Sequence, residues 1–118
     1  MNRRLQRVNE LVKREVGEII RRDFIVSEFG VVTVTSVAIS PDLKNGRIFV
    51  SVIGTPQQQT HTLRALGARR GAIQREMSRT VILKYTPHLD FLLDETGERA
   101  DRIHRILDDL HLPEDESV

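Results

Sequence analysis

The chain has 118 residues and contains neither cysteine nor tryptophan. Without cysteine, it can form no disulfide bond, no thiolate zinc site and no cysteine nucleophile. Long apolar segments are absent too, because no run approaches the roughly 18 residues that a membrane span needs. The opening residues MNRRLQRVNE also lack the apolar stretch of a signal peptide. We therefore expect a cytoplasmic protein with no membrane partner.

The sequence contains none of the glycine-rich patterns that hold the phosphates of nucleotides or dinucleotide cofactors. Only two of its four histidines, His104 and His111, share a predicted helix face, on which Asp108 also lies. Exposed histidine and aspartate on an acidic helix are usually just solvated. Asp90 and Asp94 resemble a carboxylate pair but lack a partner, so we expect a structural role for them. We predict no metal site, no cofactor and no enzymatic activity.

The charged residues are strongly segregated along the chain. Residues 1–22 carry seven Lys/Arg and three Glu, a net charge of +4, and residues 64–84 carry six Lys/Arg and one Glu, a net charge of +5. Residues 85–118 carry three Arg and ten Asp/Glu, a net charge of −7, so the formal net charge of the whole chain is only +1. Such a polarised field steers polyanions toward one face. Nucleic acid is therefore the first partner to test.

The first half of the chain predicts a helix followed by a β-hairpin. Apolar residues recur at three- and four-residue steps over 3–22, which is typical of an amphipathic helix. Residues 31–39 are rich in β-branched side chains, and residues 47–53 alternate between apolar and polar ones. The intervening residues 40–46 have the composition of a turn, with Asn45-Gly46 as its strongest pair.

The next segment predicts two helices. Thr55 can cap a helix that begins at the following proline, and Gln58 completes a capping box. The helical pattern then meets Gly67 and Gly71, each of which costs roughly 1 kcal/mol in a helix relative to alanine. We therefore predict a break within 67–71.

A third strand region is predicted over 81–93, where Pro87 must start the strand, form a bulge or lie at a sheet edge. A last helix is predicted over 100–110. The order α-β-β-α-α-β, followed by this helix, predicts an α+β fold with one three-stranded sheet covered by helices on one face. We assign residues 1–112 to a single domain and residues 113–118 to an acidic, disordered tail. The strand patterns place in the core Val34, Val50 and Leu89.

Arginine residues of the two basic segments are the candidates for a phosphate-binding site. Arg7 and Arg14 lie seven residues apart and share the helix side opposite the apolar face. Arg75 and Arg79 are four apart on one face of a later helix. A helix that begins just after Gly71 would also present free backbone N–H groups to phosphate. The candidates are Arg3, Arg4, Arg7, Arg14, Arg64, Arg69, Arg70, Gly71, Arg75 and Arg79.

Two simpler interpretations compete with phosphate binding. The basic stripe of the first helix could be only a solvated surface, and the glycines at the junction could serve close helix packing. The mode of binding is also constrained, because the chain has one tyrosine and four phenylalanines, most of them in predicted strands. Sheets that stack bases need two or three exposed aromatic side chains. We therefore expect recognition of phosphate and shape rather than stacking.

Four motifs together resemble the bacterial ribosome-binding factor A family over about residues 3–110. They are RxxRV from residue 4, GVVTVTSVxxSxDL from residue 30, RIFVS from residue 47 and TPxLxFxxD from residue 86. The resemblance implies a type II KH-like fold, with the same element order as that predicted above. Members of the family carry an Ala-x-Gly kink between the two central helices. Here Gly71 matches the glycine, whereas Arg69 occupies the alanine position, and Val26-Ser27 replaces the family's usual Asp-Pro.

The resemblance also implies a function. It implies a non-enzymatic assembly factor, acting as a monomer, that binds the free small (30S) ribosomal subunit and assists late maturation of its 16S ribosomal RNA. Cold adaptation often depends on such factors. Two other classes stay open from the residues alone: a KH-like module that binds another structured RNA, and a protein–protein adaptor that uses the acidic C-terminal helix.

Overall fold

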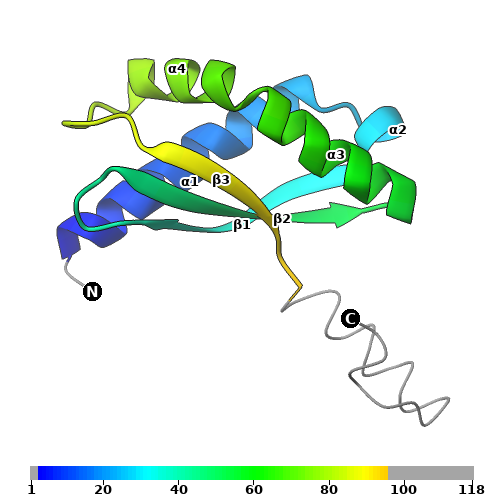
Figure 1. Cartoon of the computed structure of the whole chain (residues 1–118), viewed down its shortest axis with the longest axis horizontal. Coiled ribbons are helices and arrows are strands. Elements are labelled where there is room, and N and C mark those ends of the chain that lie inside the picture. Colours follow the sequence, from blue (N-terminus) through cyan, green and yellow to red (C-terminus); the bar gives the residue numbers. More distant parts are fainter. Residues whose placement is uncertain (1–2, 96–118) are drawn as a thin grey trace, which may run out of the picture.

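The computed structural model describes residues 3–95, and their order matches the predicted α-β-β-α-α-β apart from one added short helix (Figure 1). The expected helix over 100–110, the tail at 113–118 and the His104–His111 pair lie outside the described residues, so the assignment of 1–112 to one domain stays a prediction. The elements are α1 (Arg3–Asp23), α2 (Val26–Phe29), β1 (Val31–Ile39), β2 (Asn45–Ile53), α3 (Pro56–Ala68), α4 (Arg70–Thr80) and β3 (His88–Leu93).

The three strands form one sheet in the order β1-β2-β3. β1 and β2 are an antiparallel hairpin, whereas β2 and β3 are parallel. Parallel neighbours need a long crossover connection, and α3 with α4 supplies it. The register of the hairpin shifts between Val34 and Ser36. At this bulge the Thr35 hydroxyl lies 3.1 Å from the Phe49 carbonyl oxygen and 2.6 Å from Asp94 Oδ2, which is the structural role expected for that aspartate.

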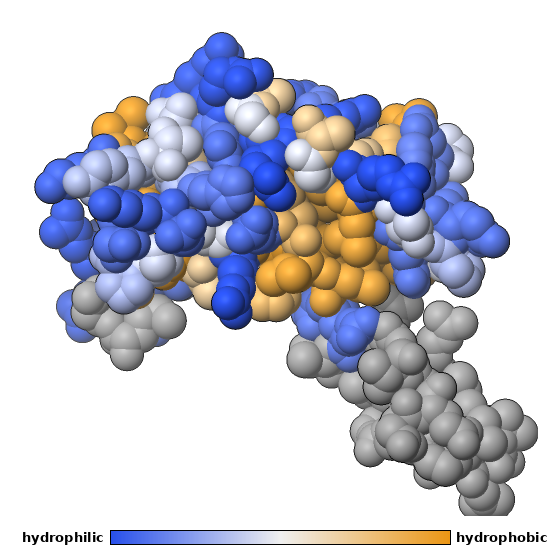
Figure 2. Space-filling view, viewed as in Figure 1, coloured by the Kyte–Doolittle hydropathy of each residue, from blue (hydrophilic) through white to orange (hydrophobic). Residues whose placement is uncertain are grey.

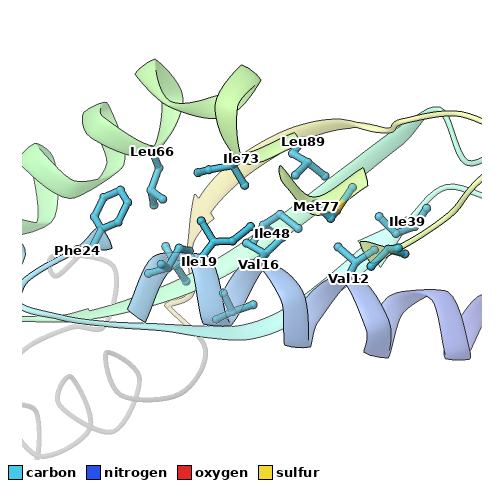
Figure 3. Packing of buried hydrophobic residues seen from close by; sticks show 14 of the residues in the cluster. Val12, Val16, Ile19, Phe24, Ile39, Ile48, Leu66, Ile73, Met77 and Leu89 are labelled. Carbon is cyan, nitrogen blue, oxygen red and sulfur yellow. The ribbon is translucent and has the colours of Figure 1, made fainter. Parts of the chain in front are cut away.

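The hydrophobic core lies between one face of the sheet and the helices. Val16 of α1 and Met77 of α4 point toward Ile48 of β2 (Figure 3). The three residues placed in the core by sequence are buried, with exposed fractions of 7% for Val34 and 0% for Val50 and Leu89. Hydrophilic residues cover most of the outer surface of the helices, and an apolar area lies below α3 beside the end of β3 (Figure 2).

Some boundaries differ from the sequence prediction. β3 begins at His88 rather than near residue 81, because Pro87 has no N–H to donate to a ladder. Asn45 and Gly46 belong to β2 rather than to the turn. Gly46 is needed for packing, since a Cβ there would lie 2.6 Å from Ile39 Cδ1. Helix α2 has no counterpart in the prediction.

The predicted start of α3 is confirmed in detail. The Gln58 backbone N–H donates to Thr55 Oγ1 at 3.1 Å, and the Thr55 backbone N–H donates to Gln58 Oε1 at 3.0 Å. These two bonds form the capping box, which satisfies backbone donors that the first turn leaves free. The capping box therefore fixes the start of α3 against the end of β2.

Candidate nucleic-acid interface

The basic stripe of α1 faces away from the core. Val12 and Val16 are fully buried on one side of this helix. Arg3, Arg7 and Arg14 are exposed on the opposite side. The amphipathic pattern read from the sequence is thus the one that the fold uses, and it leaves these three guanidinium groups facing the solvent.

The fold places the two basic segments on one side of the sheet, in a helical layer formed by α1, α3 and α4 (Figure 1). The Arg22 guanidinium of α1 contacts the Glu76 carboxylate of α4, with a distance of 2.6 Å from Nη1 to Oε2. The Arg69 guanidinium reaches the Asp23 carbonyl oxygen at 3.5 Å. The C-terminal end of α1 therefore lies beside α4 and the residue that precedes it, although the two helices are far apart in sequence.

The charges at this end of the layer largely neutralise one another. Side-chain hydrogen bonds from Arg22 lower the pKa of Glu76 and the pKa of Asp23 below their ordinary values of 4.5 and 3.8. The same bonds raise the pKa of Arg22, and Arg21 forms a separate ion pair with Glu18. Phosphates are therefore attracted less strongly here than to the rest of the layer.

The break between α3 and α4 is a single residue, Arg69, whose backbone has φ −94° and ψ 5°. The expectation of a helix beginning after Gly71 is wrong, because α4 begins at Arg70 and Gly71 lies in its first turn. Close helix packing does not require these glycines either. A Cβ at Gly67 would meet nothing within 4 Å, and one at Gly71 would meet only the flexible Arg75 guanidinium, at 3.3 Å.

The Arg69 side chain is held by aromatic residues of the same chain. Its guanidinium carbon lies 4.8 Å from the Phe24 ring centroid and 5.6 Å from that of Phe29. Cation–π attraction acts at these distances. The Phe29 ring in turn stacks on His61, with centroids 4.9 Å apart. The residue at the kink thus ties the α3–α4 junction to the segment that follows α1.

Arg70 also has partners within the fold. Its Nε donates to the Leu89 carbonyl oxygen at 2.7 Å, and its Nη2 lies 3.6 Å from the Asp90 carboxylate. Gln74 accepts from the Leu89 backbone N–H at 2.8 Å. These contacts fasten α4 to the start of β3, so Arg70 is less available to phosphate than its exposed neighbours.

The remaining candidate arginines form no ion pair with any residue in 3–95. They are Arg3, Arg4, Arg7, Arg14, Arg64, Arg75 and Arg79, all of them exposed. The structure adds Lys44 and Lys84, which the sequence analysis did not select. Lys84 belongs to the basic segment and could have been included. Lys44 could not have been included, because it lies in residues 23–63, which carry a net charge of −1.

Other kinds of site find no support in the described part of the chain. Residues 3–95 contain no group of three or more His, Cys, Asp or Glu side chains that could hold a metal ion. No helix among them is long and apolar enough to span a membrane.

Comparison with known proteins places the chain in a family. The family model for ribosome-binding factor A matches residues 4–107. The chain is 39% identical to ribosome-binding factor A of Opitutus terrae, over 93% of this chain and 89% of that one. It is 40% identical to that of Akkermansia muciniphila, over 93% of this chain and 86% of the relative.

Solved structures show the same fold. The crystal structure of ribosome-binding factor A from Thermus thermophilus aligns with a TM-score of 0.68 and 22% identity, covering 75% of this chain and 94% of that one. The solution structure of a Thermotoga maritima protein, described as a putative ribosome binding factor A, aligns with a TM-score of 0.66 and 22% identity, covering 83% of this chain and 95% of that one. With the family model and these relatives in agreement, the chain belongs to the ribosome-binding factor A family.

Proposed function

We propose that this chain is a ribosome assembly factor that binds the free 30S subunit and assists late maturation of 16S ribosomal RNA without catalysing a reaction. The observation that carries the proposal is the helical layer, where two distant basic segments meet and seven exposed arginines form no ion pair within residues 3–95. Family membership supports it. So does a Thermus thermophilus ribosome binding factor A that was fitted into a cryo-EM map of a 30S complex.

The exposed arginines provide the affinity in this proposal. Guanidinium groups displace counterions from phosphates, an attraction that does not depend on base sequence and weakens with salt. Arg75 and Arg79 on α4, with Arg7 and Arg14 on α1, contact the RNA backbone directly. Arg69 contributes mainly by holding the kink. The protein acts as a monomer in the cytoplasm, and it recognises folded RNA by the spacing of phosphates.

Sedimentation of a cell lysate on a sucrose gradient tests the proposal. We expect the chain to migrate with free small subunits and not with whole ribosomes. Migration with another RNA species would support a KH-like module for a different target. Binding to small subunits that persisted after the exposed arginines were replaced with glutamine would support the adaptor interpretation.

A further inference from the structure

A pocket of about 530 Å³ lies at one end of the helical layer. Three segments meet there: the start of α1, the turn between β1 and β2, and the loop between α4 and β3 (Figure 1). Its volume lies within the roughly 300–1,000 Å³ range of small-ligand pockets. It is lined by Arg4, Leu5, Val8, residues 41–44, Lys84 and Tyr85.

The rim of this pocket is cationic. Arg4, Lys44 and Lys84 come from the three different segments, and none of them forms an ion pair with another residue of the described chain. The carboxylate among the lining residues, Asp42, is held within the turn. It accepts from the Ser40 hydroxyl at 2.6 Å and from the Lys44 backbone N–H at 3.0 Å, and these bonds lower its pKa. Asp42 therefore stays ionised, but the three cations outnumber it, and the rim keeps a net positive charge that attracts anions.

An aromatic ring lies within the same pocket. Tyr85 is 41% exposed, and the Nζ atoms of Lys44 and Lys84 lie over its ring, 5.3 Å and 5.5 Å from the centroid. A base that stacks on the ring would displace one of these ammonium groups, which could then turn to its phosphate. Leu5, Leu43 and the nearly buried Val8 add apolar surface. A flat aromatic face, apolar walls and a cationic rim together suit a ligand with a planar base and a phosphate.

We propose that this pocket binds one unpaired nucleotide of the RNA, with the base stacked on Tyr85 and its phosphate between Lys44, Lys84 and Arg4. The inference rests on the proposed function for the identity of the polymer. Single strands offer the base face that a duplex hides in its stack. The pocket thus adds one stacking contact, contrary to the expectation drawn from the scarcity of aromatic residues.

The intrinsic fluorescence of the chain gives a direct test. Tyr85 is the only tyrosine and there is no tryptophan, so tyrosine emission reports on the surroundings of this one ring. We would titrate the full chain with four probes: a single-stranded RNA hexamer, an RNA duplex, an abasic hexamer with the same phosphates, and a nucleoside monophosphate. We expect saturable quenching by the single-stranded hexamer, and much less by the duplex and the abasic strand at equal phosphate concentration.

The other outcomes each overturn part of the inference. Equal quenching by the abasic hexamer would show that the pocket takes phosphate without stacking. Saturation at lower concentration by the monophosphate than by the hexamer would make it a site for free nucleotides instead of RNA. No quenching by any probe would overturn the site altogether.

Variants give a second readout that does not depend on tyrosine emission. We expect Tyr85→Leu to weaken binding of a labelled single-stranded hexamer about tenfold, since one stacked base contributes on that scale. Tyr85→Phe, which keeps the ring, should recover most of that loss. Arg47→Gln is the control outside the pocket, and thermal melting of each variant verifies the fold. Equal affinity of Tyr85→Leu and the unmodified chain would overturn stacking.

The pocket and the proposed function can fail separately. If Tyr85→Leu bound the hexamer normally while the unmodified chain still migrated with small subunits, only the pocket would be wrong. If the unmodified chain did not migrate with small subunits but its tyrosine were still quenched by single-stranded RNA, the pocket would stand and the ribosomal partner would be wrong.

Discussion

At the scale of single residues, Arg69 stabilises the fold through its contacts with Phe24 and Phe29. A cation–π contact at an exposed site contributes about 0.5–1 kcal/mol. We therefore expect Arg69→Gln to lower the free energy of unfolding by about 0.5–1 kcal/mol, measured by urea denaturation. Arg64→Gln is the matched control, because Arg64 is exposed and has no ion pair among residues 3–95. Equal stability of the two variants would show that the aromatic contacts of Arg69 contribute nothing.

The ion pair between Arg22 and Glu76 predicts a pH dependence. The hydrogen bonds from Arg22 make the Glu76 carboxyl more acidic in the folded chain than its ordinary pKa of 4.5. A lowered folded pKa stabilises the protein above the unfolded pKa, and this stabilisation is lost as the pH falls through the folded pKa. Glu76→Gln should thus melt at a lower temperature than the unmodified chain at pH 6. The difference should shrink as the pH falls below 4.5.

Calorimetry from pH 6 to pH 3 measures this difference. The effect should be small, since both side chains are substantially exposed and exposed pairs contribute little. A constant offset between the two melting curves over the whole range would contradict the assignment of this titration to Glu76.

At the scale of elements, the short strand β3 offers a fully buried and an exposed leucine that can be compared directly. Leu89 is fully buried, whereas Leu92 is 39% exposed. Leu89→Ala should cost about 2–5 kcal/mol, because a buried leucine leaves a cavity when truncated. Leu92→Ala should cost less than about 1 kcal/mol, in line with substitutions at the surface. Equal losses of unfolding free energy in chemical denaturation would contradict the assignment of Leu89 to the core side of β3 and Leu92 to its exposed side.

The elements also show how far the sequence could predict the fold. Local sequence is sufficient to predict α1, β1 and the start of α3. The first two follow from side-chain patterns and the third from its capping residues, all of which are neighbours in the chain. Sequence pattern places the kink within 67–71, yet neither glycine marks it. Arg69 does, and its partners Phe24 and Phe29 are distant in sequence. Local patterns cannot reveal a contact that exists only after tertiary packing.

The candidate site divides in the same way. The outward arginines of α1 and α4 could be predicted, because helical spacing alone decides which side they face. The contacts of Arg70 with Leu89 and Asp90 could not be predicted, because they depend on how the crossover connection places α4 against β3. The Tyr85 pocket was equally hidden, since its three walls come from segments that only the folded hairpin and crossover bring together.

At the scale of the whole molecule, charge is separated even within the helical layer. Arg21 and Arg22 are paired near the junction of α3 and α4. Toward the other end of α1, Arg3, Arg4 and Arg7 are free of ion pairs among residues 3–95, and Lys44 and Lys84 share a pocket with Arg4. On α1, the attractive potential for a polyanion is therefore concentrated at the end away from the junction. RNA should be oriented along the layer by this gradient.

Salt dependence measures how many of these charges meet phosphates. Replacing Arg7, Arg14, Arg75 and Arg79 together with glutamine should weaken binding to small subunits. It should also flatten the plot of log affinity against log salt by about 0.7–0.9 for each phosphate that an arginine no longer neutralises. Arg47→Gln is the matched control, since Arg47 is exposed on β2 between two residues that face the core, and so points away from the helices. It should leave the slope unchanged. If the quadruple variant kept its fold, its affinity and its salt slope, the helical layer would not be the RNA-binding surface, and binding would have to come from another face of the chain.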